Sequence, residues 1–126
     1  NFIKNAEIPE LGVPGTHNKE NAKCALSLSK YLSIEIKNSQ NALRKFKGTW
    51  RRFEIIGEKN GVIVIDDYGH HPDEVRLTLE ATKEKYPEKR VICVFQPHQY
   101  SRTKYFLEDF KNCRLRLLFF TALLVC

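Results

Sequence analysis

The sequence predicts an α/β fold built on a parallel sheet, and three observations support this class. Two continuous apolar runs, GVIVI at residues 61–65 and RVICVF at residues 90–95, are typical of strands buried on both faces. A segment with helical character follows each run. From Gly61 onward the order is therefore strand, helix, strand, helix, strand. Such alternation favours parallel strands joined by right-handed crossover helices.

The composition of the 126 residues excludes several classes of protein. With 42% hydrophobic and 29% charged residues, the chain is not disordered, and no apolar run reaches the about 20 residues of a membrane span. The net charge of +6 arises from basic residues scattered among acidic ones. It fits a phosphorylated small molecule, nucleic acid or a merely solvated surface. Four widely spaced cysteines without a C-x-x-C pair favour reduced thiols in a cytoplasmic protein.

The first third of the chain is predicted to be mainly helical. Residues 1–17 contain prolines and glycines and are expected to form a strand or loop that ends in a turn. A first helix is expected over about residues 18–33, with one apolar face formed by Ala25, Leu28 and Leu32. A second helix, over about residues 38–46, ends before Gly48. The pattern changes near residues 47–50, which are the candidate domain boundary.

A hairpin and a well-marked helix follow this boundary. Residues 51–57 are predicted to form a strand, and Asn60-Gly61 is a hairpin-type turn signal. The run His71-Pro72-Asp73-Glu74 opens a helix, because proline suits the first helical position and carboxylates suit the positive end of the helix dipole. Lysines near residue 85 suit the other end.

Two further elements are predicted near the end of the chain. Ser101 is expected to cap a helix over about residues 102–111, and residues 115–120 are expected to form a third strand. The single tryptophan, Trp50, is expected to pack against its neighbours.

Two polar segments directly follow the two buried strands, at residues 66–72 and 96–103. In open parallel sheets, ligands bind beyond the carboxyl ends of the strands. Both segments also lead into helix N-termini, which favour anions. We therefore expect the two segments to converge on one cleft that binds a nucleotide.

The residue types in the first two clusters leave alternatives open. Asp66 and Asp67 are adjacent on a strand and point to opposite faces, so they are not a paired acid and base. Either one binds a ligand hydroxyl such as that of a ribose, or both form turns. Neighbouring histidines rarely bind the same ion, so helix capping or ligand hydrogen bonding is favoured over zinc for His70, His71 and His98.

Three other groups have both a structural and a functional interpretation. Arg51 and Arg52 either form surface salt bridges or reach phosphate oxygens, which suit the planar guanidinium. The segment from Gly15 to Asn21 is either an ordinary helix start or a contact to a nucleobase edge. Arg102 is either a solvated residue of a first helical turn or a ligand contact.

Four phrases together resemble the Mur ligase family. They are Pro14-Gly15-Thr16-His17-Asn18-x-x-Asn21-Ala22, Phe46-x-Gly48-x-x-Arg51-Arg52-Phe53-Glu54, Asp66-Asp67-Tyr68-Gly69-His70-His71-Pro72-x-Glu74 and Phe95-Gln96-Pro97-His98-x-Tyr100-Ser101-Arg102-Thr103. In this order and spacing, over about residues 10–112, they resemble the members that join L-alanine to UDP-N-acetylmuramate.

The resemblance implies a fold and a reaction. Residues 1–47 would form the helical tail of a central, ATP-binding domain. Residues 48–126 would form a truncated, Rossmann-like C-terminal domain with parallel strands and crossover helices. The implied reaction is ATP-driven amide formation, in which the sugar carboxylate becomes an acyl phosphate and the amine of L-alanine attacks it.

The resemblance also implies roles for individual residues. Arg52 resembles the catalytic cation that reaches the ATP phosphates, with Arg51 less certain, and Asp67 resembles the partner of the ribose hydroxyls. The adenine-side contacts would be His17, Asn18 and Asn21. The wall that faces the nucleotide and the amino-acid substrate would be formed by Tyr68, His70, His98 and Arg102.

The chain departs from the family in two respects. It lacks the phosphate loop G-x-x-x-x-G-K-[ST], and it lacks the carboxylate and histidine ligands of the Mg²⁺ ion that is expected in the full-length enzyme. The largely apolar end, residues 114–126, is typical of a frameshifted or miscalled gene end. We therefore expect a fragment that is inactive alone.

Two alternative functions remain at this point. One is a related Mur ligase that attaches a whole peptide to the same sugar. The other is a non-enzymatic nucleotide-binding module. The chain has no pattern of stacking aromatic and basic residues of the RNA-binding type, so no nucleic-acid partner is expected.

Overall fold

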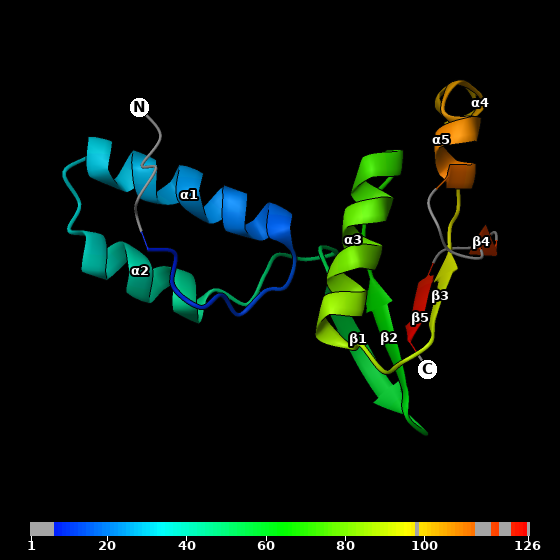
Figure 1. Cartoon of the computed structure of the whole chain (residues 1–126), viewed down its shortest axis with the longest axis horizontal. Coiled ribbons are helices and arrows are strands. Elements are labelled where there is room, and N and C mark those ends of the chain that lie inside the picture. The colour runs from blue at the N-terminus through cyan, green and yellow to red at the C-terminus, as the bar shows by residue number, and fades with distance from the viewer. Residues whose placement is uncertain (1–6, 98, 113–116, 119–121, 126) are drawn as a thin grey trace. The chain divides into compact units, whose positions relative to one another are not determined.

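The computed structural model describes residues 7–97, 99–112, 117–118 and 122–125 (Figure 1). Contacts within the chain form two compact units, Asn1–Gly48 and Thr49–Cys126, here called the first and second unit. Every helix within the described ranges is too short or too polar to span a membrane.

The first unit contains two helices that pack side by side, α1 at Thr16–Tyr31 and α2 at Ile36–Lys45 (Figure 1). Both predicted helices are confirmed, and each begins two residues earlier than expected. The predicted apolar face of α1 is wrong, because Leu28 and Leu32 are 58% and 57% exposed. The buried side chains are those of Ala22 and Leu26, which lie one turn apart on another stripe of the helix.

Helix α1 ends in a hydrogen-bonded turn that the sequence does not predict. The N–H of Ile34 donates to the carbonyl of Ser29 over 2.8 Å, and the N–H of Ser33 donates to that of Lys30 over 3.0 Å. Ser33 has a φ of 58°, the left-handed conformation that usually falls to glycine at this position. The helix therefore stops at Tyr31, before the predicted end.

The second unit is built on a five-stranded sheet in the order β1-β2-β5-β3-β4. The strands are β1 at Glu54–Lys59, β2 at Val62–Asp66, β3 at Val91–Val94, β4 at Leu117–Leu118 and β5 at Ala122–Val125. Strands β1 and β2 form the predicted antiparallel hairpin, and Asn60 and Gly61 at its turn both have positive φ. Of the predicted strand at residues 115–120, only β4 lies within the described residues.

The α/β class is confirmed, but the sheet is mixed and not wholly parallel as predicted. Strand β4 pairs with β3 in parallel. Strand β5 pairs antiparallel with both β2 and β3, and it lies between them. The two predicted buried strands therefore run in the same direction without being neighbours, because the end of the chain occupies the place between them.

Three helices follow the hairpin: α3 at Pro72–Lys85, α4 at Tyr100–Tyr105 and α5 at Leu107–Asn112. Helix α3 begins at the predicted proline and carries acidic residues in its first turn and lysines in its last. The single helix predicted over residues 102–111 is two short helices that meet at Phe106. The predicted Ser101 cap is also wrong, because α4 begins at Tyr100 with Gln99 before it.

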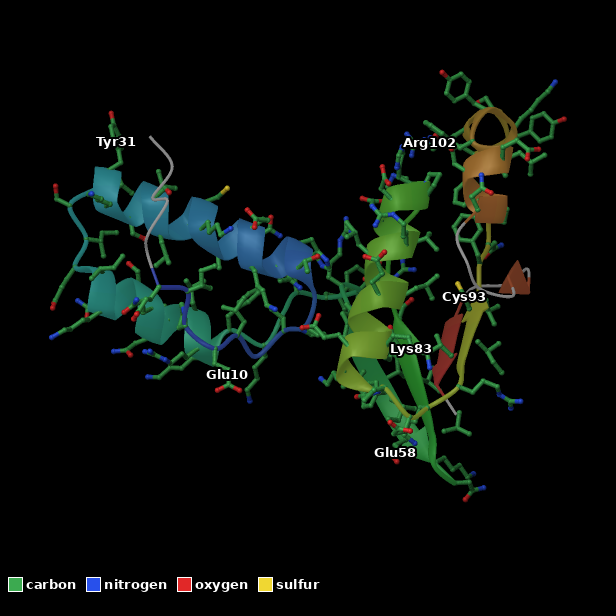
Figure 2. All side chains as sticks on the ribbon, viewed as in Figure 1. Glu10, Tyr31, Glu58, Lys83, Cys93 and Arg102 are labelled. Carbon is green, nitrogen blue, oxygen red and sulfur yellow. The ribbon has the colours of Figure 1, made fainter. Side chains whose placement is uncertain are left out.

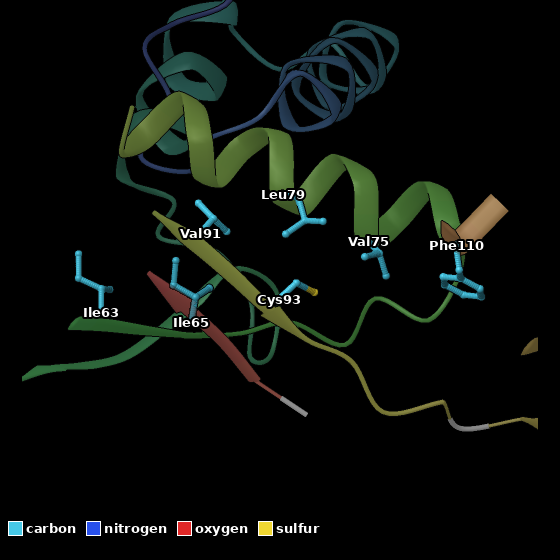
Figure 3. Packing of buried hydrophobic residues seen from close by; sticks show 7 residues of the cluster. All are labelled: Ile63, Ile65, Val75, Leu79, Val91, Cys93 and Phe110. Atoms are coloured by element: carbon cyan, nitrogen blue, oxygen red, sulfur yellow. The ribbon is translucent and has the colours of Figure 1, made fainter. Parts of the chain in front are cut away.

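The core of the second unit lies between α3 and one face of the sheet (Figure 3). Side chains on α3, including Val75 and Leu79, face those on β2 and β3. Burial alternates along both strands, so Ile63 and Ile65 are buried while Val62 and Val64 are half-buried. The prediction of strands buried on both faces is thus right for one face, the one that α3 covers.

Strand β1 lies at one edge of the described sheet. All of its residues after Glu54 are exposed, including Ile55 and Ile56. The pairing register with β2 shifts between Ile55 and Gly57, which marks a β-bulge.

Candidate functional site

The two polar segments that follow β2 and β3 line one pocket of the second unit, with a volume of about 490 Å³. Asp67, Tyr68 and His70 come from the segment after β2. Gln96 and Arg102 come from the segment after β3. Figure 2 shows Arg102 beyond the carboxyl end of β3, at the opposite end of this unit from Glu58. The predicted convergence of the two segments is therefore confirmed.

The carboxylate of Asp67 joins two parts of the pocket wall. Its Oδ2 accepts a hydrogen bond of 2.9 Å from the N–H of Phe53, and its Oδ1 accepts one of 2.7 Å from the N–H of Gly69. A Cβ atom at residue 69 would lie 2.9 Å from Oδ1, so glycine permits this close approach. Each carboxylate oxygen has two lone pairs, which leaves Asp67 able to accept a further bond from a ligand hydroxyl.

Arg51 lines the pocket and is held there by its neighbours. Its Nε donates to Oδ2 of Asp66 over 2.9 Å. Its guanidinium carbon lies 5.2 Å from the ring centroid of Tyr68 and 5.7 Å from that of Trp50. Trp50 itself is 80% exposed, so the expectation that it packs against its neighbours is wrong for most of its surface, although its ring lies against Arg51.

The backbone before β1 is a turn and not the predicted strand. Arg51 and Phe53 have φ values of 53° and 51°, in the left-handed region. Two hydrogen bonds of 2.8 Å hold the turn, from the N–H of Arg51 to Glu54 and from the N–H of Tyr68 to the carbonyl of Arg51. The resemblance to the family favoured Arg52 over Arg51 as the phosphate contact, and the sequence carries no sign of these backbone angles.

Arg52 lies outside the set of side chains that line the pocket. Its Nη1 is 3.7 Å from Oε1 of Glu74, and its side chain is about half exposed. The other oxygen of Glu74 accepts hydrogen bonds from the N–H groups of His70 and His71, over 2.9 and 3.1 Å. Arg52 is thus tied to the start of α3.

The surroundings of Glu74 lower the pKa of its carboxyl group below the ordinary value of 4.5. Partial burial raises this pKa. The hydrogen bonds from the backbone of His70 and His71 and the charges of His70 and Arg52 together lower it by a larger amount, so the net shift is downward. Glu74 is therefore ionised at neutral pH and acts as a hydrogen-bond acceptor.

The histidines after β2 have structural partners. Nδ1 of His70 lies 3.1 Å from the carbonyl of Tyr68, and the ring of His70 contacts the Tyr68 ring edge to face. His71 is the N-cap of α3, where its Nδ1 accepts from the N–H of Asp73 over 3.3 Å. His98 lies outside the described residues. Among the described residues, no three His, Cys, Asp or Glu side chains are grouped as metal ligands.

The predicted adenine contacts belong to the first unit, in the first two turns of α1. Asn18 donates from its side chain to the carbonyl of Pro14 over 2.7 Å, which supports the start of the helix. Asn21 is exposed. Nδ1 of His17 is buried without a hydrogen-bond partner among the described residues, and such atoms usually find a partner in folded proteins.

Known proteins resemble this chain over most of its length. The UDP-N-acetylmuramate–L-alanine ligase of Clostridium kluyveri is 55% identical over 100 residues, which are 79% of this chain and 22% of that protein. The ligase of the same name from Clostridium acetobutylicum is 53% identical over 103 residues, 82% of this chain and 22% of that protein. The chain thus spans about a fifth of the length of the curated relatives it matches.

Two solved structures are also similar. The UDP-N-acetylmuramate–alanine ligase of Thermotoga maritima matches with a TM-score of 0.69 and 30% identity, over 88% of this chain and 30% of that one. A murein peptide ligase from Psychrobacter arcticus matches with a TM-score of 0.53 and 31% identity, over 79% of this chain and 21% of that one. The family described as "Mur ligase, glutamate ligase domain" matches residues 51–122. Because that match covers more than half of the chain, the chain belongs to the Mur ligase family.

Proposed function

We propose that this chain is part of an ATP-dependent ligase that joins L-alanine to UDP-N-acetylmuramate in peptidoglycan precursor synthesis. The observation that carries the proposal is the convergence of Asp67 and Arg102 on one pocket beyond β2 and β3. Relatives with that ligase name are 45–55% identical to this chain, which supports the choice of substrates.

The two units take different parts in this proposal. The first unit is the end of the central, ATP-binding domain, and its His17, Asn18 and Asn21 contact the adenine. The second unit is the C-terminal domain, in which Asp67 binds the ribose and Arg52 reaches the phosphates. Tyr68, His70, His98 and Arg102 form the wall toward the nucleotide and the amino acid.

The proposed chemistry is amide formation through an acyl phosphate. The lactyl carboxylate of the sugar takes the terminal phosphoryl group of ATP, and ADP leaves. The amine of L-alanine then attacks the acyl carbon and phosphate leaves. Arginine side chains stabilise the charge on the transferring phosphoryl group and hold the carboxylate of L-alanine, because their planar donors match both groups.

The residues that the structure describes do not fit a Mg²⁺ site. A magnesium site in such enzymes uses carboxylates together with substrate phosphates, and the described residues contain no group of acidic or histidine side chains suited to it. The sequence also has no G-x-x-x-x-G-K-[ST] phosphate loop. We therefore assign no step to a metal held by the described residues, and we propose that turnover requires the remaining parts of the ligase.

Titration calorimetry of the 126-residue chain with ATP tests the nucleotide site. We expect saturable binding, and we expect Asn21→Ala to weaken it roughly tenfold by removing adenine contacts. Asn38→Ala is the matched control, because Asn38 is also exposed and lies on α2 of the same unit. Absence of ATP binding, or equal binding of ATP and inorganic tripolyphosphate, contradicts the proposal.

A second candidate is a ligase that attaches a whole peptide to the same sugar. The likeness to the murein peptide ligase of Psychrobacter arcticus favours it specifically. Titration of the ATP-loaded chain with L-alanine and with a tripeptide that begins with L-alanine separates the two. Preference for L-alanine supports the first function, and preference for the tripeptide supports the second.

A further inference from the structure

We propose that Arg51 is an anion-binding residue of the pocket, held in position by Asp66, and that it contacts a phosphate or carboxylate oxygen of the bound ligand. The identity of that ligand rests on the proposed function. The geometry of Arg51 is independent of it.

The guanidinium of Arg51 is fixed on three sides. Asp66 accepts its Nε proton at 2.9 Å, with the two side chains only 32% and 25% exposed. The rings of Trp50 and Tyr68 lie within 6 Å of the guanidinium carbon, at distances where a cation is attracted to an aromatic face. An arginine restrained in this way loses little further freedom when a ligand binds.

The two terminal nitrogens of the Arg51 guanidinium, Nη1 and Nη2, can donate hydrogen bonds to a ligand. Asp66 uses only Nε. Among the described residues, the hydrogen bond and ion pair recorded for the Arg51 side chain both involve Nε and not Nη1 or Nη2. These two groups carry four N–H donors in a planar arrangement that suits a phosphate or a carboxylate.

A second arginine also lines the pocket. The carboxylate of Asp66 is balanced by Arg51, and the carboxylate of Asp67 accepts two backbone N–H groups. Arg102 brings a second cation to the same pocket from α4. Two arginines from different walls can therefore hold two anionic groups, or two oxygens of one triphosphate.

The backbone at Arg51 directs this side chain and not the next one to the pocket. Left-handed φ values at Arg51 and Phe53 are uncommon for residues other than glycine, and such conformations gather at functional sites. Arg52, in the same turn, is directed to Glu74.

Titration of the full chain with ATP, inorganic tripolyphosphate and L-alanine tests the proposal. If the anion is phosphate, we expect Arg51→Gln to weaken the binding of ATP and of tripolyphosphate roughly tenfold and to leave the binding of L-alanine unchanged. If the anion is a carboxylate, we expect Arg51→Gln to weaken the binding of L-alanine alone. Arg51→Lys should lose as much as Arg51→Gln, because a single ammonium is neutralised by Asp66. Arg90→Gln removes an exposed charge at the other end of β3 and should bind all three probes normally.

Two further readouts separate the outcomes. In the wild-type chain, the Arg51 Nε–H resonance should shift when the effective anion is added. In the Asp66→Asn variant, exchange of the Arg51 Nε proton with solvent should become at least roughly tenfold faster, which loss of fold elsewhere does not produce.

Normal binding of all probes by a folded Arg51→Gln variant overturns the inference while leaving an ATP site intact. Tripolyphosphate binding that depends on Arg51 without ATP preference upholds it while the nucleotide proposal fails. No binding of any anion overturns both.

Discussion

At the scale of single residues, Asp67 connects segments that are well separated in the sequence. Its two oxygens accept from the N–H groups of Phe53, before the hairpin, and Gly69, after it. Without Asp67, both N–H groups lose a charged acceptor in a half-buried place. One side chain therefore shapes the turn of Arg51 and the loop of His70 together.

Replacement of Asp67 by alanine should destabilise the second unit by about 2 kcal/mol, since hydrogen bonds to a charged group contribute about 1.5–3 kcal/mol. Urea unfolding followed by circular dichroism measures the change. Glu88→Ala is the control, because Glu88 is exposed in the turn before β3, and it should change stability by less than about 0.5 kcal/mol. Equal stability of the two variants contradicts this account.

The order of residue types along the sequence predicted most of the residues that line the pocket, but it did not predict which of the two neighbouring arginines lines it. Asp67, Tyr68, His70 and Arg102 were expected at the cleft and do line it. That Arg51 and not Arg52 lines the pocket was not predictable, because it depends on positive φ values at non-glycine residues.

At the scale of elements, α3 shows how local sequence and tertiary contacts agree. His71 caps the first turn, Pro72 occupies the first helical position, and Glu74 accepts from the backbone before the helix. These features form a reciprocal capping box, in which two N–H groups at the helix start are satisfied by side chains. Glu74 additionally pairs with Arg52, so the same carboxylate supports the helix and the turn before β1.

The pKa of Glu74 predicts a loss of stability in acid. Because the folded chain lowers this pKa below 4.5, the ionised carboxylate contributes its full stabilisation above pH 4.5. That contribution is lost as the pH falls through the lowered pKa of the folded state. The free energy of unfolding of wild type and of Glu74→Gln should therefore differ at pH 7 and converge in acid.

Urea unfolding between pH 7 and pH 2.5 measures this difference. Glu80→Gln is the matched control on the same helix, because Glu80 is exposed and pairs only with Arg76 among the described residues. A Glu74→Gln effect that stays constant over the whole pH range contradicts the assigned role.

The contact between α3 and β3 should carry much of the stability of the second unit. Leu79 is 3% exposed and faces the strands, so Leu79→Ala should cost about 2–5 kcal/mol through lost burial and a cavity. Leu107→Ala, at a residue that is 44% exposed on α5, should cost far less. Chemical denaturation measures both changes, and similar costs would show that α3 does not cover the core as described.

Strong local signals predicted elements well, and long-range pairing was not predictable. The valine and isoleucine runs became β2 and β3, and Asn60-Gly61 became the hairpin turn. The break at Phe106 has neither proline nor glycine to mark it. The place of β5 between β2 and β3 arises from pairing with strands far away in the sequence, which local patterns do not encode.

At the scale of the whole molecule, the two units differ in how much apolar surface they bury. The first unit buries Ala22 and Leu26 on α1, while α2 buries none of its side chains. In the second unit, seven of the described residues form a continuous buried cluster. Small cores contribute little stability, so the first unit is expected to open more often.

Amide hydrogen exchange tests this difference. We expect the amides of α1 and α2 to exchange at least roughly tenfold faster, relative to their intrinsic rates, than those of β2, β3 and α3. Because the contacts divide into two units, Leu79→Ala should speed exchange in the second unit and leave α1 unchanged. Uniform protection over both units, or a uniform response to Leu79→Ala, contradicts independent opening.

The edge position of β1 has a consequence for handling the protein. Its outer side presents backbone donors and acceptors together with exposed Ile55 and Ile56, which is a template on which strands of other molecules can add. The bulge near Gly57 and the charges of Glu58 and Lys59 oppose such stacking. Substitutions that neutralise these two charges should therefore increase amyloid-like aggregation of the protein.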